Sequence, residues 1–177
     1  MSFFFSLKVL SLASCNIQAS GASAVAAMLK SIRCGIQYLS LECNTLGSQG
    51  IGALCAEGFN SVLQVLNIAS TGVVSHDSLF AVNSLGPAIR NAKSLVAVDF
   101  NLNVLTPDSA AALSLHLAKA KRDGSKIEEF IVTTSLDHES YRSLALDPSL
   151  MSAWSSRVRE KNTATLRRTP TPSPFDR

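Results

Sequence analysis

Apolar and polar residues follow a fixed order that is clearest in the segment IQYLSLECNTLGSQGIGAL, which begins at Ile36. Leu39 and Leu41 are two residues apart, which is the side-chain period of a strand, and a polar residue, Asn44, follows where that strand should end. The glycine-bounded residues after it have apolar positions at helical spacing. The pattern therefore predicts a short strand, a turn around an asparagine, and a helix.

The same order of residues returns along most of the chain. Matches to L-x-x-L-x-L-x-x-N/C-x-L start at residues 7, 36, 63, 95 and 127, and the match at 127 loses the pattern after its ninth position. The ninth position is polar or small, and we expect its side chain to hold backbone groups that leave the sheet. The residues there are Cys15, Asn44, Thr71, Asn103 and Ser135.

Helices are predicted between the strand motifs because apolar residues recur there with a period of 3.6, as at Ala22, Val25 and Leu29. Three local departures are expected. Residues 75–80 look like an insertion between strand and helix, and residues 118–126 overshoot after the fourth helix. The pair Gly86-Pro87 predicts a kink or a late start of the third helix.

These repeats of about 29 residues, with a full helix and glycines near the helix starts, resemble the ribonuclease-inhibitor class of leucine-rich repeats. The resemblance implies an α/β solenoid of right-handed strand-helix units with a parallel sheet on the concave face. It covers residues 7–146, or about 4.5 repeats. We expect residues 147–161 to form a helical C-terminal cap, with a preceding short helix over 137–146.

The two ends of the chain differ from the repeats. Residues 1–6 form an apolar N-terminal edge that contains three phenylalanines and no polar capping unit, so either a partner covers it or the chain is part of something longer. Residues 162–177 form a basic tail rich in Pro, Thr and Ser. Its Ser/Thr-Pro dipeptides at Thr169, Thr171 and Ser173 resemble sites of proline-directed phosphorylation.

Composition narrows the classes of function. The 177 residues are 46% hydrophobic with a net charge of +3, and the excess of cations lies past residue 156, so the folded part is nearly neutral. This balance argues against nucleic acid or a membrane surface as the partner. No apolar run reaches the ~18 residues of a membrane span. Leu12 to Cys15 resembles a bacterial lipobox, but the same residues fall in register with the repeats.

We find no set of residues for catalysis, a cofactor or a metal. The four cysteines lack a CxxC pair, and His76, His116 and His138 lie in different repeats. Gly47, Gly50 and the glycine at 52 lack the order and the lysine of a phosphate-binding loop. We therefore predict a non-enzyme without a small-molecule substrate, with free thiols suited to the cytoplasm.

Leucine-rich repeats of this class include activators of the Ran GTPase, which present an arginine from a strand-to-helix loop. The corresponding segments here contain no Arg or Lys, so an arginine-finger mechanism has no candidate. These segments are Asn16–Gly21, Thr45–Gly50, Gly72–Asp77 and Val104–Asp108.

The informative surface is the concave one, where alternate strand residues face outward. Our hypothesis is that it binds a basic or hydrogen-bond-rich protein element, with Tyr38 as aromatic anchor and acidic residues selecting the partner. The alternative is a merely solvated sheet face. The candidate binding residues are Tyr38, Glu42, Asn67, Asp99, Asn101 and Glu129.

A basic patch is predicted at the end of the fourth helix, at Lys119, Lys121, Arg122 and Lys126. Cations are favoured at a helix C-terminus, which explains them without a partner, and an acidic partner is the alternative. Residues 166–169 (LRRT), after an amphipathic segment around residues 150–158, resemble the actin-binding motif of tropomodulin relatives.

The predicted function is a protein-interaction scaffold, acting as a subunit of a larger intracellular assembly of cytoskeletal or ciliary type. The alternatives are a tropomodulin-like actin-binding protein and a GTPase-activating or receptor-type leucine-rich-repeat fragment.

Overall fold

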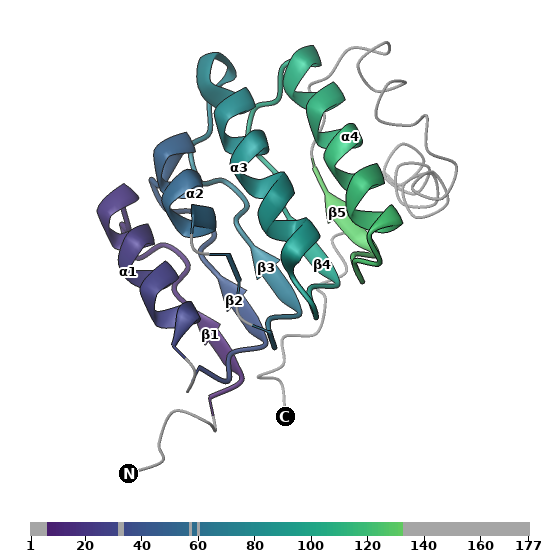
Figure 1. Ribbon diagram of the computed structural model, residues 1–177. Helices are drawn as coiled ribbons and strands as arrows, with labels where there is room; N and C mark the ends of the chain where they lie inside the picture. Colours follow the sequence, from purple (N-terminus) through teal and green to yellow (C-terminus); the bar gives the residue numbers. More distant parts are fainter. Residues whose placement is uncertain (1–6, 32–33, 57, 60, 133–177) are drawn as a thin grey trace, which may run out of the picture.

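A computed structural model describes residues 7–31, 34–56, 58–59 and 61–132. Figure 1 shows strands and helices alternating along the chain, with the strands side by side in one layer and the helices side by side in another. The predicted cap, the tail with Thr169, Thr171 and Ser173, His138 and the ninth-position Ser135 lie outside the described residues.

Each strand is three residues long, and a helix follows each of the first four. The strands are β1 (Val9–Ser11), β2 (Tyr38–Ser40), β3 (Val65–Asn67), β4 (Ala97–Asp99) and β5 (Glu129–Ile131). The helices are α1 (Ala19–Lys30), α2 (Gly47–Ala56), α3 (Ser78–Asn91) and α4 (Pro107–Arg122), with a 3₁₀ turn, η2 (Ser75–Asp77), before α3.

The five strands form one parallel sheet in chain order, β1-β2-β3-β4-β5. Their central residues stand in one register row, in which Leu39 pairs with Leu10 on one side and with Leu66 on the other. Parallel neighbours in chain order are the topology that stacked strand-helix units produce. The predicted α/β repeat solenoid is therefore confirmed.

The core lies between the sheet and the helices and is almost entirely aliphatic. Leu39, Leu66 and Val98 point into it from the strands, and Leu54 and Leu113 meet them from the helices, all fully buried. Burying each of these side chains contributes about 1.5–3 kcal/mol. Short strands are sufficient because each repeat adds its apolar residues to a core shared with its neighbours.

The third helix starts early and runs through its proline. The predicted late start of this helix at Gly86-Pro87 is wrong, because α3 begins at Ser78 and continues past Pro87 to Asn91. Its buried face holds the helix across this point, since Leu85 and Ile89 are fully buried on either side of the proline. The neighbouring Gly86 has a separate role, because a Cβ there would lie 2.2 Å from the His116 ring of α4.

The predicted overshoot after the fourth helix is mostly helix. Residues 118–122 belong to α4, which ends at Arg122, so the loop to β5 is shorter than expected. Gly124 ends the helix with a positive φ of 79°, and its N–H donates to the Lys121 carbonyl. Of the other expected insertion, residues 75–77 form η2 and the rest is the first turn of α3.

Buried asparagines join neighbouring repeats at the turn after the strand. The Oδ1 of Asn44 accepts hydrogen bonds from the N–H groups of Cys15 (3.0 Å) and Ile17 (2.9 Å) in the first repeat. Its Nδ2 donates to the Leu12 carbonyl of that repeat and to the Leu41 carbonyl of its own, both at 2.8 Å. The Nδ2 also donates to the Glu42 carbonyl at 3.3 Å, so one amide serves five backbone groups, as expected for the ninth position.

Asn103 makes the same set of bonds between the third and fourth repeats. Its Oδ1 accepts from the N–H groups of Thr71 and Val73, both at 3.1 Å, and its Nδ2 donates to the Ile68 carbonyl at 2.8 Å. The Thr71 hydroxyl also reaches this Oδ1, at 3.2 Å.

The junction between the second and third repeats lacks such a bridge. Its ninth position is Thr71, whose hydroxyl donates to the Ile68 carbonyl (2.9 Å) of its own repeat. At the other two junctions an asparagine side chain accepts from two backbone N–H groups. The corresponding groups here are the backbone N–H groups of Asn44 and Leu46, which make no hydrogen bond to another described residue. This junction therefore has fewer polar links than its neighbours.

Replacing Asn103 with alanine should lower the free energy of unfolding by about 2–5 kcal/mol, because two buried N–H groups lose their acceptor. Chemical denaturation followed by circular dichroism measures this. Asn83→Ala is the matched control: Asn83 is an exposed residue of α3 whose side-chain oxygen lies 3.1 Å from the His116 Nε2, and its loss should cost under about 0.5 kcal/mol. Equal losses in the two variants would contradict the bridging role of Asn103.

Thr71→Asn should raise the free energy of unfolding by about 1 kcal/mol, because an amide oxygen at this position can accept from the N–H groups of Asn44 and Leu46. The same denaturation experiment measures the change, and Thr45→Asn, at an exposed position, is the control. A Thr71→Asn protein less stable than the wild type would contradict this expectation.

Candidate functional site

The outward residues of the strands form ordered rows across the sheet. In the first row Val9, Tyr38, Val65 and Ala97 stand side by side, ending at Glu129 on β5. In the second row the residues are Ser11, Ser40, Asn67, Asp99 and Ile131. The first row is apolar over its first four strands, and the second is polar over its first four. The face is therefore amphipathic along the strand direction.

The polar row is fixed by hydrogen bonds to the chain just beyond each strand. Asn67 accepts from the N–H of Ala69 and Asp99 accepts from the N–H of Asn101, each through Oδ1 at 2.9 Å. Ser40 accepts more weakly from the N–H of Glu42, at 3.4 Å. These local turns hold the side chains in one orientation.

The structure brings some of the predicted binding residues together and keeps others apart. Asn67 donates from Nδ2 to the Glu42 carboxylate at 3.2 Å, which joins β3 to the end of β2. Asp99 and Asn101 form a second pair at the end of β4, and the Oδ1 of Asn101 is buried without a hydrogen-bond partner in the described part of the chain. Tyr38 and Glu129 lie in the first row, three strands apart.

The concave face carries negative charge and no positive charge on its described strands. Glu42, Asp99 and Glu129 lie on or just after β2, β4 and β5, whereas no strand residue from β1 to β5 is Lys or Arg. Three carboxylates at separate positions repel one another weakly and favour a cation above them.

The cations lie instead at the edge where helices end and strands begin, called here the helix-end edge. Of the predicted basic patch, Lys119, Arg122 and Lys126 are exposed and Lys121 is half-buried. Four more cations, which were not predicted as part of the basic patch, stand at or near a helix end or a strand start. They are Lys8, Lys30, Arg90 and Lys93.

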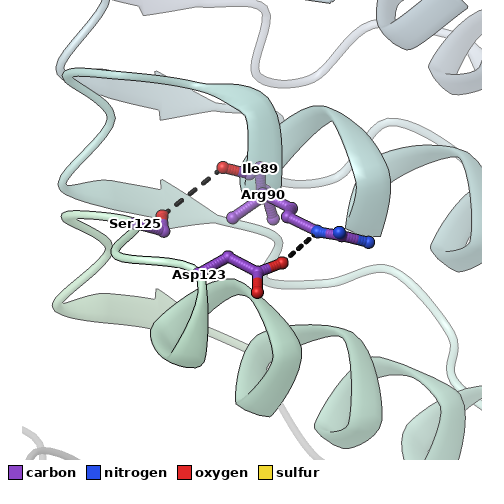
Figure 2. Close-up of polar contacts among 4 residues, drawn as sticks. All are labelled: Ile89, Arg90, Asp123 and Ser125. Atoms are coloured by element: carbon purple, nitrogen blue, oxygen red, sulfur yellow. Dashed lines mark hydrogen bonds and ion pairs between the residues drawn. The ribbon is translucent and has the colours of Figure 1, made fainter.

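One acid at this edge is paired. Figure 2 shows the Arg90 guanidinium at the end of α3 in an ion pair with Asp123, the residue after α4. The Ser125 hydroxyl beside them donates to the Ile89 carbonyl at 3.4 Å. Asp123 sits at a helix C-terminus, where a negative charge is unfavourable, and Arg90 compensates it. These contacts fasten the last loop to the third repeat.

Titratable groups in the described residues show no catalytic arrangement. Burial raises the pKa of the Cys55 thiol to about 12, which makes it unreactive. Burial first, and the nearby Lys119 second, lower the pKa of His116, whose Nε2 lies 3.1 Å from the Asn83 amide oxygen. No group of three His, Cys, Asp or Glu side chains in these residues is placed to hold a metal ion.

A depression of about 510 Å³ between α1 and α2 is lined by alanines and by Ser23, Lys30 and Ser31, without a cluster of reactive groups. None of the helices described has the length and apolar character needed to cross a bilayer.

Comparisons with known proteins agree with the geometry. A family model described as "Leucine Rich repeat" matches residues 5–26 and 36–55, which are the first two strand-helix units. Among the 39 matching chains of solved structures is "Leiomodin-1 Actin-Binding Site 2 (ABS2)", with a TM-score of 0.67 and 10% identity over 91% of each chain. At that identity the likeness concerns the fold alone. No curated protein sequence matches the chain.

Proposed function

We propose that this chain, which is a leucine-rich-repeat protein, is a non-enzymatic module that binds a protein partner on the concave face of its sheet. The observation that carries the proposal is the pair of rows on that face. Tyr38, Val65 and Ala97 offer an apolar strip, and Asn67 and Asp99 offer acceptors beside it.

The rows suit an element that lies across the strands. Five parallel strands at a spacing of about 4.8 Å extend roughly 19 Å from first to last. A helix of about 13 residues spans that distance. One side of such a helix would cover the apolar row, and its Lys or Arg side chains would meet Glu42 and Asp99.

The fixed acceptors favour binding on entropic grounds. Asp99 is held by the N–H of Asn101, and Glu42 is held by Asn67, so little side-chain freedom remains to be lost. Ordering a free side chain at an interface costs about 0.5–1.5 kcal/mol, and that cost is already met within the folded protein. Specificity then follows from charge, because an acidic partner would be repelled.

Within this proposal the module is a subunit of a larger intracellular assembly of cytoskeletal or ciliary type. Two observations on the described residues support it. The outer edge of β1 has no neighbouring strand, and Leu10 and Leu12 are only partly buried there. All four cysteines are free thiols, which suits a reducing compartment.

The test replaces Glu42 with Gln and Asp99 with Asn, which removes two charges and keeps an acceptor oxygen at each site. The amount of partner protein that the double variant recovers from cell extract, measured by quantitative mass spectrometry, should be at least tenfold lower than with the wild type. Glu128→Gln, which removes one exposed charge just before β5, is the control and should bind normally. Undiminished recovery by the double variant would refute binding on the concave face.

Actin binding is a second candidate, favoured by one observation: the similar solved structure is titled an actin-binding site. The predicted motif at 166–169 lies outside the described residues.

If actin is the partner, the full chain should sediment with filaments or change the polymerisation rate of pyrene-labelled actin at micromolar concentration. The Glu42→Gln and Asp99→Asn double variant, and a variant with Arg167 and Arg168 replaced by Ala, would separate a concave-face contact from a tail contact. No effect of the wild-type chain in either assay would remove this candidate.

A further inference from the structure

The cations of the helix-end edge are concentrated in the third and fourth repeats, at the ends of α3 and α4 and in the loops that follow them. This part of the edge has two acids, Asp123 and Glu128, and Asp123 is paired with Arg90. Six cations and two acids leave a charge of +4 here, above the +3 of the whole chain. Five of the cations make no side-chain hydrogen bond or ion pair with another residue of the described part. They are Lys93, Lys119, Lys121, Arg122 and Lys126.

The two loops that carry these cations lie side by side. At their start the Arg90 guanidinium of the third repeat pairs with Asp123 of the fourth (Figure 2). At their end the N–H of Glu128 donates to the Val96 carbonyl at 2.8 Å. Because these contacts join the ends of two neighbouring repeats, the cations of both repeats form one surface.

Helix stability does not explain this many cations. A cation near the C-terminus of a helix is favourable, but the effect falls off within the last turn, and Lys93 and Lys126 lie outside the helices. The helix α2 has no basic residue in its last turn. Lys119 and Arg122 are three residues apart on α4, where like charges repel each other. An anionic partner would relieve that repulsion.

The cations are accessible, and their potential acts on a neighbouring group. Lys93, Lys119, Arg122 and Lys126 are exposed, and Lys121 is half-buried.

His116 lies one turn before Lys119 on α4, and burial first and Lys119 second lower the pKa of its imidazole. The positive charge at the end of α4 therefore influences groups on the same helix.

The surroundings of the cations favour an acidic polypeptide over other anionic partners. Residues 87–96 and 117–128 contain no Phe, Tyr or Trp on which nucleic-acid bases could stack. None of the exposed large apolar side chains of the described part lies within 117–128, where a membrane surface would take one up. Neighbouring helices pack about 8–10 Å apart, a distance that about three residues of an extended chain cover. A short run of acidic residues is therefore long enough to meet both repeats.

We propose that the helix-end edge of the third and fourth repeats is a second docking surface, separate from the concave face, for an acidic segment of a partner protein. Carboxylates of that segment pair with Lys119, Arg122 and Lys126 at the end of α4, and Lys93 extends the surface to the third repeat. The two surfaces select partners of opposite charge.

The probe is a fluorescein-labelled peptide of about 12 residues in which Glu and Gly alternate, titrated with the full chain and followed by fluorescence polarisation. The wild-type chain should bind it at low salt, and the dissociation constant should rise about tenfold from about 0.05 M to about 0.3 M salt, since the paired charges are exposed. Replacing Lys119, Arg122 and Lys126 with Gln should also raise the dissociation constant about tenfold. The circular dichroism spectrum of this edge variant should match that of the wild type, because all three side chains are exposed.

The matched control removes the same charge elsewhere, by replacing the three arginines of the basic tail, Arg167, Arg168 and Arg177, with Gln. It should bind the acidic peptide within about twofold of the wild type. The Glu42→Gln and Asp99→Asn double variant should also keep this binding, so the edge and the concave face succeed or fail separately.

Four results would overturn the proposal. The first is no binding of the acidic peptide by the wild type at low salt, and the second is an equal loss in the edge variant and the tail variant. The third is a thymidine oligonucleotide of equal charge that binds more tightly than the peptide and is lost with the edge variant, which would assign the edge to nucleic acid. The fourth is light scattering that shows copies of the chain associating through these cations.

Discussion

The structure depends on the buried amide of asparagine at the turn after the strand. The chain turns away from the sheet after each three-residue strand, and one side-chain amide there bonds to backbone groups of two repeats at once. An apolar side chain at this position could pack as well, but it would leave N–H groups buried without acceptors. At the two junctions that carry this asparagine, polar contacts therefore add to the alignment of the repeats, while the energy of folding comes from the buried aliphatic side chains.

The concave face follows from the same arrangement. Because all five strands pair in one register, the outward residues of successive strands align in rows, so single residue choices combine into a strip. Its polar row is fixed by turns within each repeat, as with Asp99 and Asn101. Binding on such a surface requires few conformational changes in the domain, and sequence changes at outward positions alter the surface without altering the core.

Much of this was predictable, and the reasons for the remainder are physical. The strand motifs and the role of Asn44 and Asn103 follow from spacing, because a repeated unit makes a weak local signal strong. The helix ends could not be predicted from spacing alone. The helix α3 crosses Gly86-Pro87 because core packing at Leu85 and Ile89 overrides the local propensity of these two residues. The pairing of Glu42 with Asn67, and of Arg90 with Asp123, depends on register between repeats.

The separation of charge between the two edges has a consequence for how the protein meets other molecules. In the described part of the chain, lysines and arginines outnumber the acids Asp123 and Glu128 where helices end, and the acids Asp77, Asp99 and Asp108 stand where strands end. Such a domain has an electric dipole moment along its strands, so a charged filament or complex exerts a torque on it before contact. The domain would approach already rotated, with one edge leading, and its rate of productive encounter would depend on ionic strength more than its small net charge suggests.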